Sequence, residues 1–147
     1  MSIVWSDDFA TGIDIIDSQH QRLFTYFQDI EQCIAAEDTA SVEQLCRGLI
    51  DYAVSHNSFE ESLMEQAGYP MLEGHHRVHE AFKQRTQGYL QRIDSGADKL
   101  KIAREMRTDI GLWLINHIKH EDKHYSPYVR KSLDKGLVSR MLGKFFK

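Results

Sequence analysis

The chain has 147 residues, of which 41% are hydrophobic and 27% are charged, so one domain with its own core is expected without a stabilising disulfide. A net charge of −4 and a pI near 6.0 argue against nucleic acid as a partner. No apolar run approaches the roughly 20 residues of a membrane span, and the N-terminus lacks a signal-peptide pattern, so a cytoplasmic protein with reduced Cys33 and Cys46 is expected.

Residues 1–17 show no helical period and predict an N-terminal arm, which Trp5 would dock on the domain. Ser18 opens a capping-box pattern that ends at Gln21, and this pattern predicts the start of the first helix. The inward stripe of that helix contains one histidine among apolar residues: Ile16, His20, Leu23, Phe27, Ile30 and Ile34.

The second helix is predicted to begin at Ser41, because Gln44 completes another capping box three residues later. Gly68 suits the C-terminal cap of this helix, and Pro70 suits the first position of the next helix. The inward stripe again mixes polar and apolar side chains: Leu45, Leu49, Tyr52, His56, Phe59, Glu60 and Leu63.

The third helix has two histidines on its inward stripe, which consists of Leu72, His75, His79, Phe82, Thr86, Tyr89 and Ile93. A fourth helix is predicted from about Asp98 and should stop before Pro127. Its inward residues are Met106, Ile110, Trp113, Leu114 and His117. Short connections between four such helices predict an all-α protein, with an antiparallel up-down-up-down four-helix bundle at residues 18–126 of a single domain, 1–147.

Residues 127–147 form a basic C-terminal tail with apolar residues at helical spacing: Leu133, Leu137, Val138, Met141, Leu142, Phe145 and Phe146. The simplest interpretation is a short helix that covers the open end of the bundle. A contact with a membrane surface or with another protein is the alternative, because the tail is both basic and amphipathic.

Each predicted helix places at least one histidine on its buried face: His20, His56, His75, His79 and His117. Burying five imidazoles without partners would cost a few kcal/mol each. A shared metal site would remove that cost, because histidine is a common metal ligand. With a rise of about 1.5 Å per residue, Glu60 lies at a height between His75 and His79, so its carboxylate faces the same interior.

Five imidazoles exceed the ligands of one tetrahedral zinc, and interior carboxylates on a helical bundle are typical of two-metal proteins. An alternative is a ferritin-like centre, because Glu73 with His76 and Glu121 with His124 have the spacing Glu-x-x-His. Glu73 and His76 lie off the apolar stripe of the third helix, however, and that arrangement would leave the five inward histidines without metal.

One order of potential ligands extends along the chain: His20, His56-x-x-x-Glu60, His75-x-x-x-His79 and His117-x-x-x-x-Asp122. This order, with the surrounding segments "GIDIIDSQHQRLF", "EESLM", "AGYP" and "WLINHIKHED", resembles the hemerythrin family in its bacterial single-domain form. The resemblance covers nearly the whole chain. It implies a four-helix bundle with a non-haem di-iron centre that binds O2 reversibly.

The resemblance implies that three histidines hold one iron: His75, His79 and His117. Two histidines would hold the other iron: His20 and His56. Glu60 and Asp122 would bridge both irons together with a hydroxo or oxo group. The first iron then has a full set of six ligands and the second has five, so O2 is expected at the open position of the second iron.

Helical spacing alone favours Glu121 as the inward carboxylate of the fourth helix, whereas the resemblance selects Asp122. A local widening of the helix to five-residue spacing would reconcile the two, and such bulges are frequent at functional sites. Tyr125 is expected either to hydrogen-bond to Asp122 or to serve only in packing. An apolar wall around O2 is expected from Phe59, Trp113, Leu114 and Ile118.

The expected function is storage or delivery of O2 by a monomeric carrier with two iron ions, not by an enzyme. Two alternatives use the same centre: an O2 or redox sensor that acts through a partner, and a di-iron oxidase or ferroxidase. The sequence contains no acid–base pair that would support the enzymatic alternative.

Overall fold

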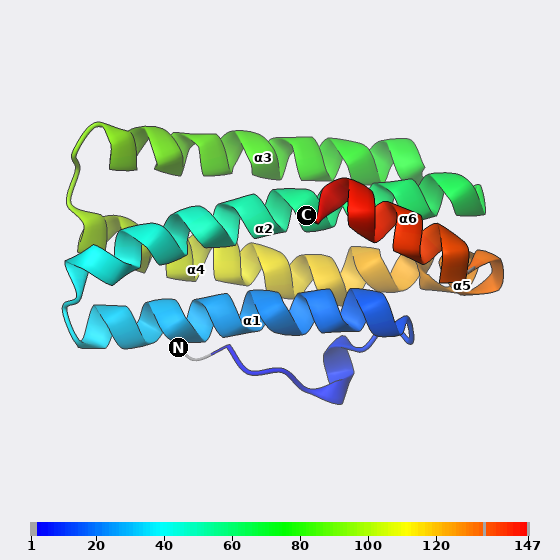
Figure 1. Ribbon diagram of the computed structural model, residues 1–147, viewed down its shortest axis with the longest axis horizontal. Helices are drawn as coiled ribbons and strands as arrows, with labels where there is room; N and C mark the ends of the chain where they lie inside the picture. The colour runs from blue at the N-terminus through cyan, green and yellow to red at the C-terminus, as the bar shows by residue number, and fades with distance from the viewer. Residues whose placement is uncertain (1–2, 134, 147) are drawn as a thin grey trace.

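The structure is a computed structural model that describes residues 3–133 and 135–146, and this part of the chain is helical without strands. Four long helices lie side by side and alternate in direction, which confirms the predicted all-α bundle (Figure 1). Their bounds are α1 (Asp14–Ala35), α2 (Thr39–Ala67), α3 (Leu72–Asp94) and α4 (Lys99–His117). Shorter elements are the 3-10 turn η1 (Asp7–Phe9), the π-helical segment η2 (Ile118–Asp122), α5 (Lys123–Ser132) and α6 (Lys135–Phe145).

The start of α1 differs from the prediction. The helix begins at Asp14 rather than at Ser18, and its N-cap residue makes no side-chain capping bond. Thr11 instead fixes the chain ahead of the helix, because its N–H and hydroxyl donate to Asp17 Oδ1 at 2.8 and 2.7 Å. These contacts extend the helix by a turn, so Ser18 lies inside it and the capping-box assignment is wrong.

The two ends of α2 and the start of α3 also depend on local features of the chain. Asp38, not Ser41, caps α2, because its carboxylate accepts a hydrogen bond from the Ser41 N–H at 3.1 Å. Gly68 ends α2 in the left-handed conformation with φ of 67°, as predicted. Pro70 precedes α3 rather than occupying its first position, since that helix begins at Leu72.

The fourth helical run continues past its predicted end. Asp98 caps α4 as expected, with its side chain accepting from the N–H groups of the next turn. After α4 the chain widens into η2 and continues as α5, with Pro127 inside the helix. Pro127 lacks a backbone N–H, so one hydrogen bond of the helix is missing there. The helix nevertheless continues, and the neighbouring Ser126 hydroxyl donates to the Asp122 carbonyl at 2.7 Å. A prediction based on Pro127 alone therefore ended the helix too early.

The C-terminal helix α6 folds back along α2 (Figure 1). Leu137 is buried against the bundle, and the ring of Phe146 lies 5.3 Å from Tyr52 and 5.9 Å from Phe59, between centroids. The apolar side of the tail thus packs along the side of α2, whereas the simpler of its two interpretations had placed it over the open end of the bundle. None of the described helices has both the length and the apolar character needed to span a membrane.

The buried apolar residues form two clusters, one along each half of the bundle. On α1, His20 lies between Ile16 of one cluster and Leu23 of the other, and on α2 His56 lies between Ala53 and Phe59 in the same way. A polar layer therefore crosses the bundle between two dry regions. The apolar packing on both sides fixes the height of the polar side chains.

Candidate metal centre

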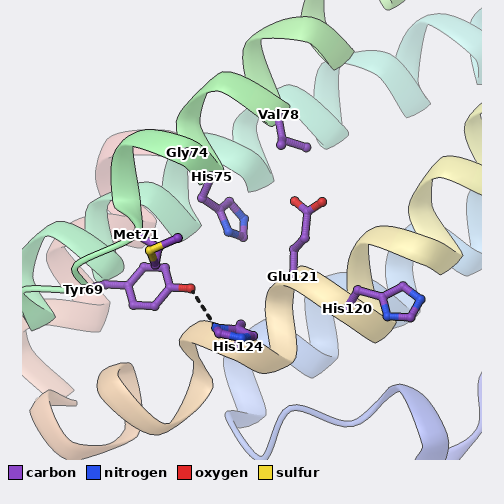
Figure 2. A pocket seen from close by; sticks show the side chains of 8 residues that line it. All are labelled: Tyr69, Met71, Gly74, His75, Val78, His120, Glu121 and His124. Atoms are coloured by element: carbon purple, nitrogen blue, oxygen red, sulfur yellow. Dashed lines mark hydrogen bonds between the residues drawn. The ribbon is translucent and has the colours of Figure 1, made fainter.

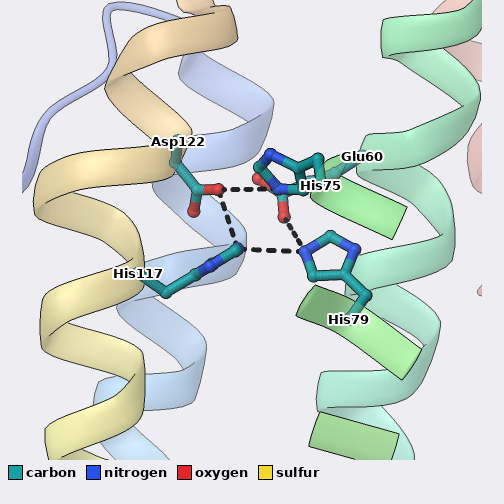
Figure 3. Close-up of side chains that lie close together, drawn as sticks. All are labelled: Glu60, His75, His79, His117 and Asp122. Atoms are coloured by element: carbon teal, nitrogen blue, oxygen red, sulfur yellow. Dashed lines mark hydrogen bonds and ion pairs between the residues drawn. The ribbon is translucent and has the colours of Figure 1, made fainter. Parts of the chain in front are cut away.

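Seven polar side chains meet in this layer and are all buried: His20, His56, Glu60, His75, His79, His117 and Asp122. They form two groups in which potential ligand atoms lie within 4.8 Å of one another. The larger group consists of Glu60, His75, His79, His117 and Asp122, and Figure 3 shows these side chains converging. The smaller group consists of His20, His56, Glu60 and Asp122. The two groups share both carboxylates, which suits two metal ions side by side.

Asp122 lies between the groups. Its Oδ1 is 3.4 Å from His75 Nε2 and 3.1 Å from His117 Nε2, whereas its Oδ2 is 3.2 Å from His20 Nε2. Each carboxylate oxygen therefore faces histidines of a different group. This is the arrangement that a carboxylate needs to bridge two ions.

Glu60 approaches the same space from α2. Its Oε1 lies 3.2 Å from His56 Nε2 and 3.8 Å from His79 Nε2, and thus faces one histidine of each group. Its Oε2 accepts a hydrogen bond of 2.5 Å from the hydroxyl of Tyr125. Tyr125 was expected to bind Asp122 or to serve only in packing, and both expectations are wrong, because the phenol reaches across to α2 instead of back along its own helix.

The π-helical segment η2 decides which carboxylate of the fourth run enters the layer. The helix widens from Ile118 to Asp122, as the five-residue spacing after His117 suggested, and Asp122 becomes fully buried. Glu121 is displaced outward, with a side chain that is 41% exposed. In a regular α-helix, Glu121 would face the polar layer and Asp122 would face outward.

Sequence reasoning missed the groups that hold the outer nitrogens of three histidines. Gln19 Oε1 lies 2.5 Å from Nδ1 of His56. Glu61 Oε2 lies 3.0 Å from Nδ1 of His79, and Glu121 Oε2 lies 3.0 Å from Nδ1 of His117. Such contacts fix the orientation of an imidazole whose other nitrogen binds a metal. Only Glu121, four residues after His117, could have been found from spacing.

The electrostatics of the layer keep both carboxylates charged. Burial and the charge of Asp122 raise the pKa of Glu60, but His56 and His20 outweigh them and hold that pKa at about 2. Burial likewise opposes ionisation of Asp122, yet His117 and the neighbouring imidazoles hold its pKa well below the usual range. The pKa of His117 is lowered by burial but raised to about 10 by Asp122. In the metal-free chain, a proton on His117 thus compensates part of the carboxylate charge.

Several buried atoms of the layer have no hydrogen-bond partner within the described part of the chain. They include Nε2 of His20, His56 and His75, Oε1 of Glu60 and both carboxylate oxygens of Asp122, which have the ion-pair contacts given above but no hydrogen bond. Buried polar atoms normally have partners, so these atoms are suited to bind something else. Imidazole nitrogens with carboxylate oxygens suit divalent ions such as iron or zinc. The cluster can therefore hold metal.

Three residues of the predicted apolar wall are buried: Phe59, Leu114 and Ile118. Trp113 is only half-buried and stacks on His117, with ring centroids 4.4 Å apart and an interplanar angle of 14°. It therefore screens the larger ligand group. A surface hollow of about 360 Å³ reaches His75 between α3 and the fourth helical run, and Figure 2 shows its lining.

The remaining histidines lie outside the layer. His76, His120 and His124 are exposed; His76 contacts Glu61, and Nδ1 of His124 lies 3.4 Å from the hydroxyl of Tyr69 (Figure 2). Glu73, which the ferritin-like alternative required, is exposed as well. That alternative is therefore wrong.

A buried histidine–carboxylate cluster inside an antiparallel four-helix bundle defines a metal-binding helical-bundle protein. The family model described as "Hemerythrin HHE cation binding domain" matches residues 11–129. The chain belongs to this hemerythrin family.

Similar proteins extend the match to nearly the whole chain. A bacteriohemerythrin from Stenotrophomonas maltophilia is 38% identical and one from Pseudomonas aeruginosa is 34% identical, each over 98% of this chain and 97% of the relative. A myohemerythrin from Riftia pachyptila is 31% identical over 83% of this chain and 89% of its own length. A solved structure of wild-type hemerythrin superposes with a TM-score of 0.78 over 88% of this chain and 98% of the other, at 24% identity, which supports the fold.

Proposed function

We propose that this protein binds O2 reversibly at a pair of iron ions, for storage or delivery of O2. The hemerythrin family binds O2 at a di-iron site, and the buried cluster offers a matching set of ligands. His75, His79 and His117 would hold one ion, and His20 and His56 the other. Glu60 and Asp122 would bridge them.

The observation that carries the proposal is that the two ligand groups contain different numbers of histidines. Both groups share the two carboxylates, but one has three histidines and the other has two. An ion in the smaller group would have one position less filled by protein, and an open position is what a small ligand requires. Iron supplies the electrons that bind O2, which a redox-inert ion such as zinc does not provide.

Apolar residues beside the ligand layer would favour release of O2 unchanged. Phe59, Leu114 and Ile118 are buried apolar residues of the two adjoining clusters and would exclude water from the bound gas. Water exclusion limits the proton supply that would convert bound O2 to free peroxide. Five neutral imidazoles with only two carboxylates also leave less negative charge than a carboxylate-rich centre, which disfavours highly oxidised iron.

The test is to measure metal content and then follow the visible spectrum of the reduced protein. We expect two irons per chain, an absorption band that forms on exposure to air, and loss of that band when O2 is removed. Permanent conversion to the ferric form after one exposure would instead favour an oxidase. A chain that binds zinc but no iron would contradict the proposal at its first step.

A further inference from the structure

Positive charge is concentrated in the last two helices of the chain. Residues 123–147 contain seven lysines and arginines and one acidic residue, whereas residues 1–122 contain eleven lysines and arginines and 21 acidic residues. Five cations of residues 123–147 have exposed side chains: Lys123, Arg130, Lys131, Arg140 and Lys144. Such a separation of charge within one domain is typical of a surface that binds an anionic partner.

These five cations form no salt bridge within the described part of the chain. Cations of the bundle, by contrast, are paired with carboxylates. Arg47 Nη2 lies 2.6 Å from Asp94 Oδ1, and Lys99 Nζ lies 3.4 Å from Glu43 Oε1. A paired cation attracts a further anion only weakly, because its field is largely cancelled by its partner. The five cations of the last helices therefore keep their attraction for an external anion.

Three of the five cations lie on one side of α5. The buried side of this helix consists of Tyr125, Ser126 and Val129. The exposed side contains no acidic residue and consists of Lys123, His124, Pro127, Tyr128, Arg130 and Lys131. α5 is thus an amphipathic helix that presents its cations to solvent.

Large apolar side chains are exposed beside these cations. Tyr128 is 44% exposed, and Leu133, directly after α5, is 37% exposed. Met71 of the α2–α3 connection is 58% exposed and lines the same hollow as Tyr69, whose ring centroid lies 5.1 Å from that of Tyr128 (Figure 2). Figure 1 shows α5 and this connection at the same end of the bundle. Three of the five exposed large apolar side chains in the described part of the chain therefore lie at this end.

We propose that the exposed side of α5, together with Leu133 and Met71, docks on the surface of an anionic lipid bilayer. The lysines and arginines of this α5 surface would approach the lipid phosphates, and its apolar side chains would enter the layer beneath the headgroups. Basic, aromatic and aliphatic side chains together suit a bilayer interface, which is charged outside and apolar inside. A nucleic acid backbone has no apolar layer, so the exposed Leu133 and Met71 favour a bilayer over a nucleic acid.

The acidic remainder of the chain is compatible with this orientation. α2 has 29 residues and is about 43 Å long at 1.5 Å per residue. Electrostatic interactions are screened over about 8 Å at physiological ionic strength. A bundle that stands on the α5 surface therefore keeps most of its carboxylates several screening lengths away from the lipid phosphates. Screening also implies that added salt weakens the attraction.

The experiment is co-sedimentation of the full chain with lipid vesicles. We expect binding to vesicles of equal parts phosphatidylcholine and phosphatidylglycerol, no binding to phosphatidylcholine alone, and release at high salt. Each cation near an anionic bilayer strengthens binding about fivefold, so Lys123→Gln combined with Lys131→Gln should weaken it about 25-fold. The matched control combines Lys83→Gln with Lys101→Gln, which changes the net charge equally at exposed positions outside the α5 surface. This control should bind nearly as tightly as the wild type.

A second pair of variants tests whether apolar side chains enter the bilayer. Tyr128→Ser combined with Leu133→Ser should weaken vesicle binding about tenfold at low salt, because less apolar surface is buried. Leu112→Ser, at a comparably exposed apolar position on α4, should leave binding unchanged. All three positions are exposed, so helix content measured by circular dichroism should stay at the wild-type value.

Several results would overturn the proposal. These are absence of binding to the anionic vesicles at low salt, and equal binding by the wild type and the variant that lacks Lys123 and Lys131. Undiminished binding by the serine pair, or equally tight binding to a DNA duplex, would overturn a bilayer as the partner. The α5 surface contains no predicted metal ligand, so the assay requires neither iron nor O2 and its outcome is independent of the proposed function.

Discussion

Replacing Asp122 by asparagine would test which carboxylate joins the two halves of the centre. The substitution keeps the volume of the side chain but removes a charge that lies 3.1 Å from His117 Nε2 and 3.2 Å from His20 Nε2. Both ions would lose a shared anionic ligand. We therefore expect Asp122→Asn to lose stable binding of the iron pair.

The metal-free chain should also be destabilised, by an amount that the pKa of His117 indicates. Burial lowers this pKa, but Asp122 and other partners raise it from 6.5 to about 10. At 1.36 kcal/mol per pKa unit, this net shift, which already includes the opposing effect of burial, corresponds to about 5 kcal/mol. Removing one partner of a buried ion pair costs about 3–5 kcal/mol, so a loss of this size is expected at neutral pH.

The pH dependence has a definite sign. The folded pKa of His117 lies above the unfolded value, so its contribution to stability is complete below pH 6.5 and disappears as the pH rises through about 10. Asp122 stays ionised across this range because its own pKa is held well below the usual range. The stability deficit of metal-free Asp122→Asn should therefore shrink as the pH approaches 10.

The assays are iron analysis after reconstitution and urea unfolding of the metal-free protein at a series of pH values. Glu121→Gln is the matched control, because Glu121 is partly exposed and faces the outer nitrogen of His117 rather than the one that would bind metal. This variant should retain both irons. Wild-type iron content and stability in Asp122→Asn, or loss of iron in Glu121→Gln alone, would refute the assignment of Asp122.

Three further outcomes are expected. Leu114→Ala, at a buried position one turn before His117, should lower the unfolding free energy by about 2–5 kcal/mol yet retain both irons. Its oxygenated form should decay faster than that of the exposed-site control Lys83→Ala. Equal decay rates would locate the O2 pocket elsewhere. Tyr125→Phe leaves an oxygen of Glu60 without its 2.5 Å donor and should lower the unfolding free energy by about 1–3 kcal/mol; unchanged urea unfolding would contradict the importance of this bond. Adding ferrous iron to the metal-free protein should acidify a weakly buffered neutral solution, because His117 must lose its proton to bind metal. A titration without proton release would contradict the raised pKa of His117.

The sequence by itself determined the bundle and the membership of its polar layer. Apolar residues at helical spacing require four amphipathic helices, and a histidine on such a stripe must face the interior whatever the details of packing. This argument selected His20, His56, His75, His79 and His117, and all five are buried in one layer. The helix ends were less accurate, because the Thr11–Asp17 hydrogen bonds extend α1 and Asp38, not Ser41, caps α2.

Only the tertiary structure decided how the fourth helical run meets this layer. Periodicity assumes a uniform helix and favoured Glu121, whereas η2 shifts the helical phase and buries Asp122. The partner of Tyr125 was likewise inaccessible to local reasoning, since Glu60 lies 65 positions away on α2. Spacing along a helix reports which face a side chain occupies. The distance to a side chain on another helix depends on how the helices pack, and no local pattern encodes that.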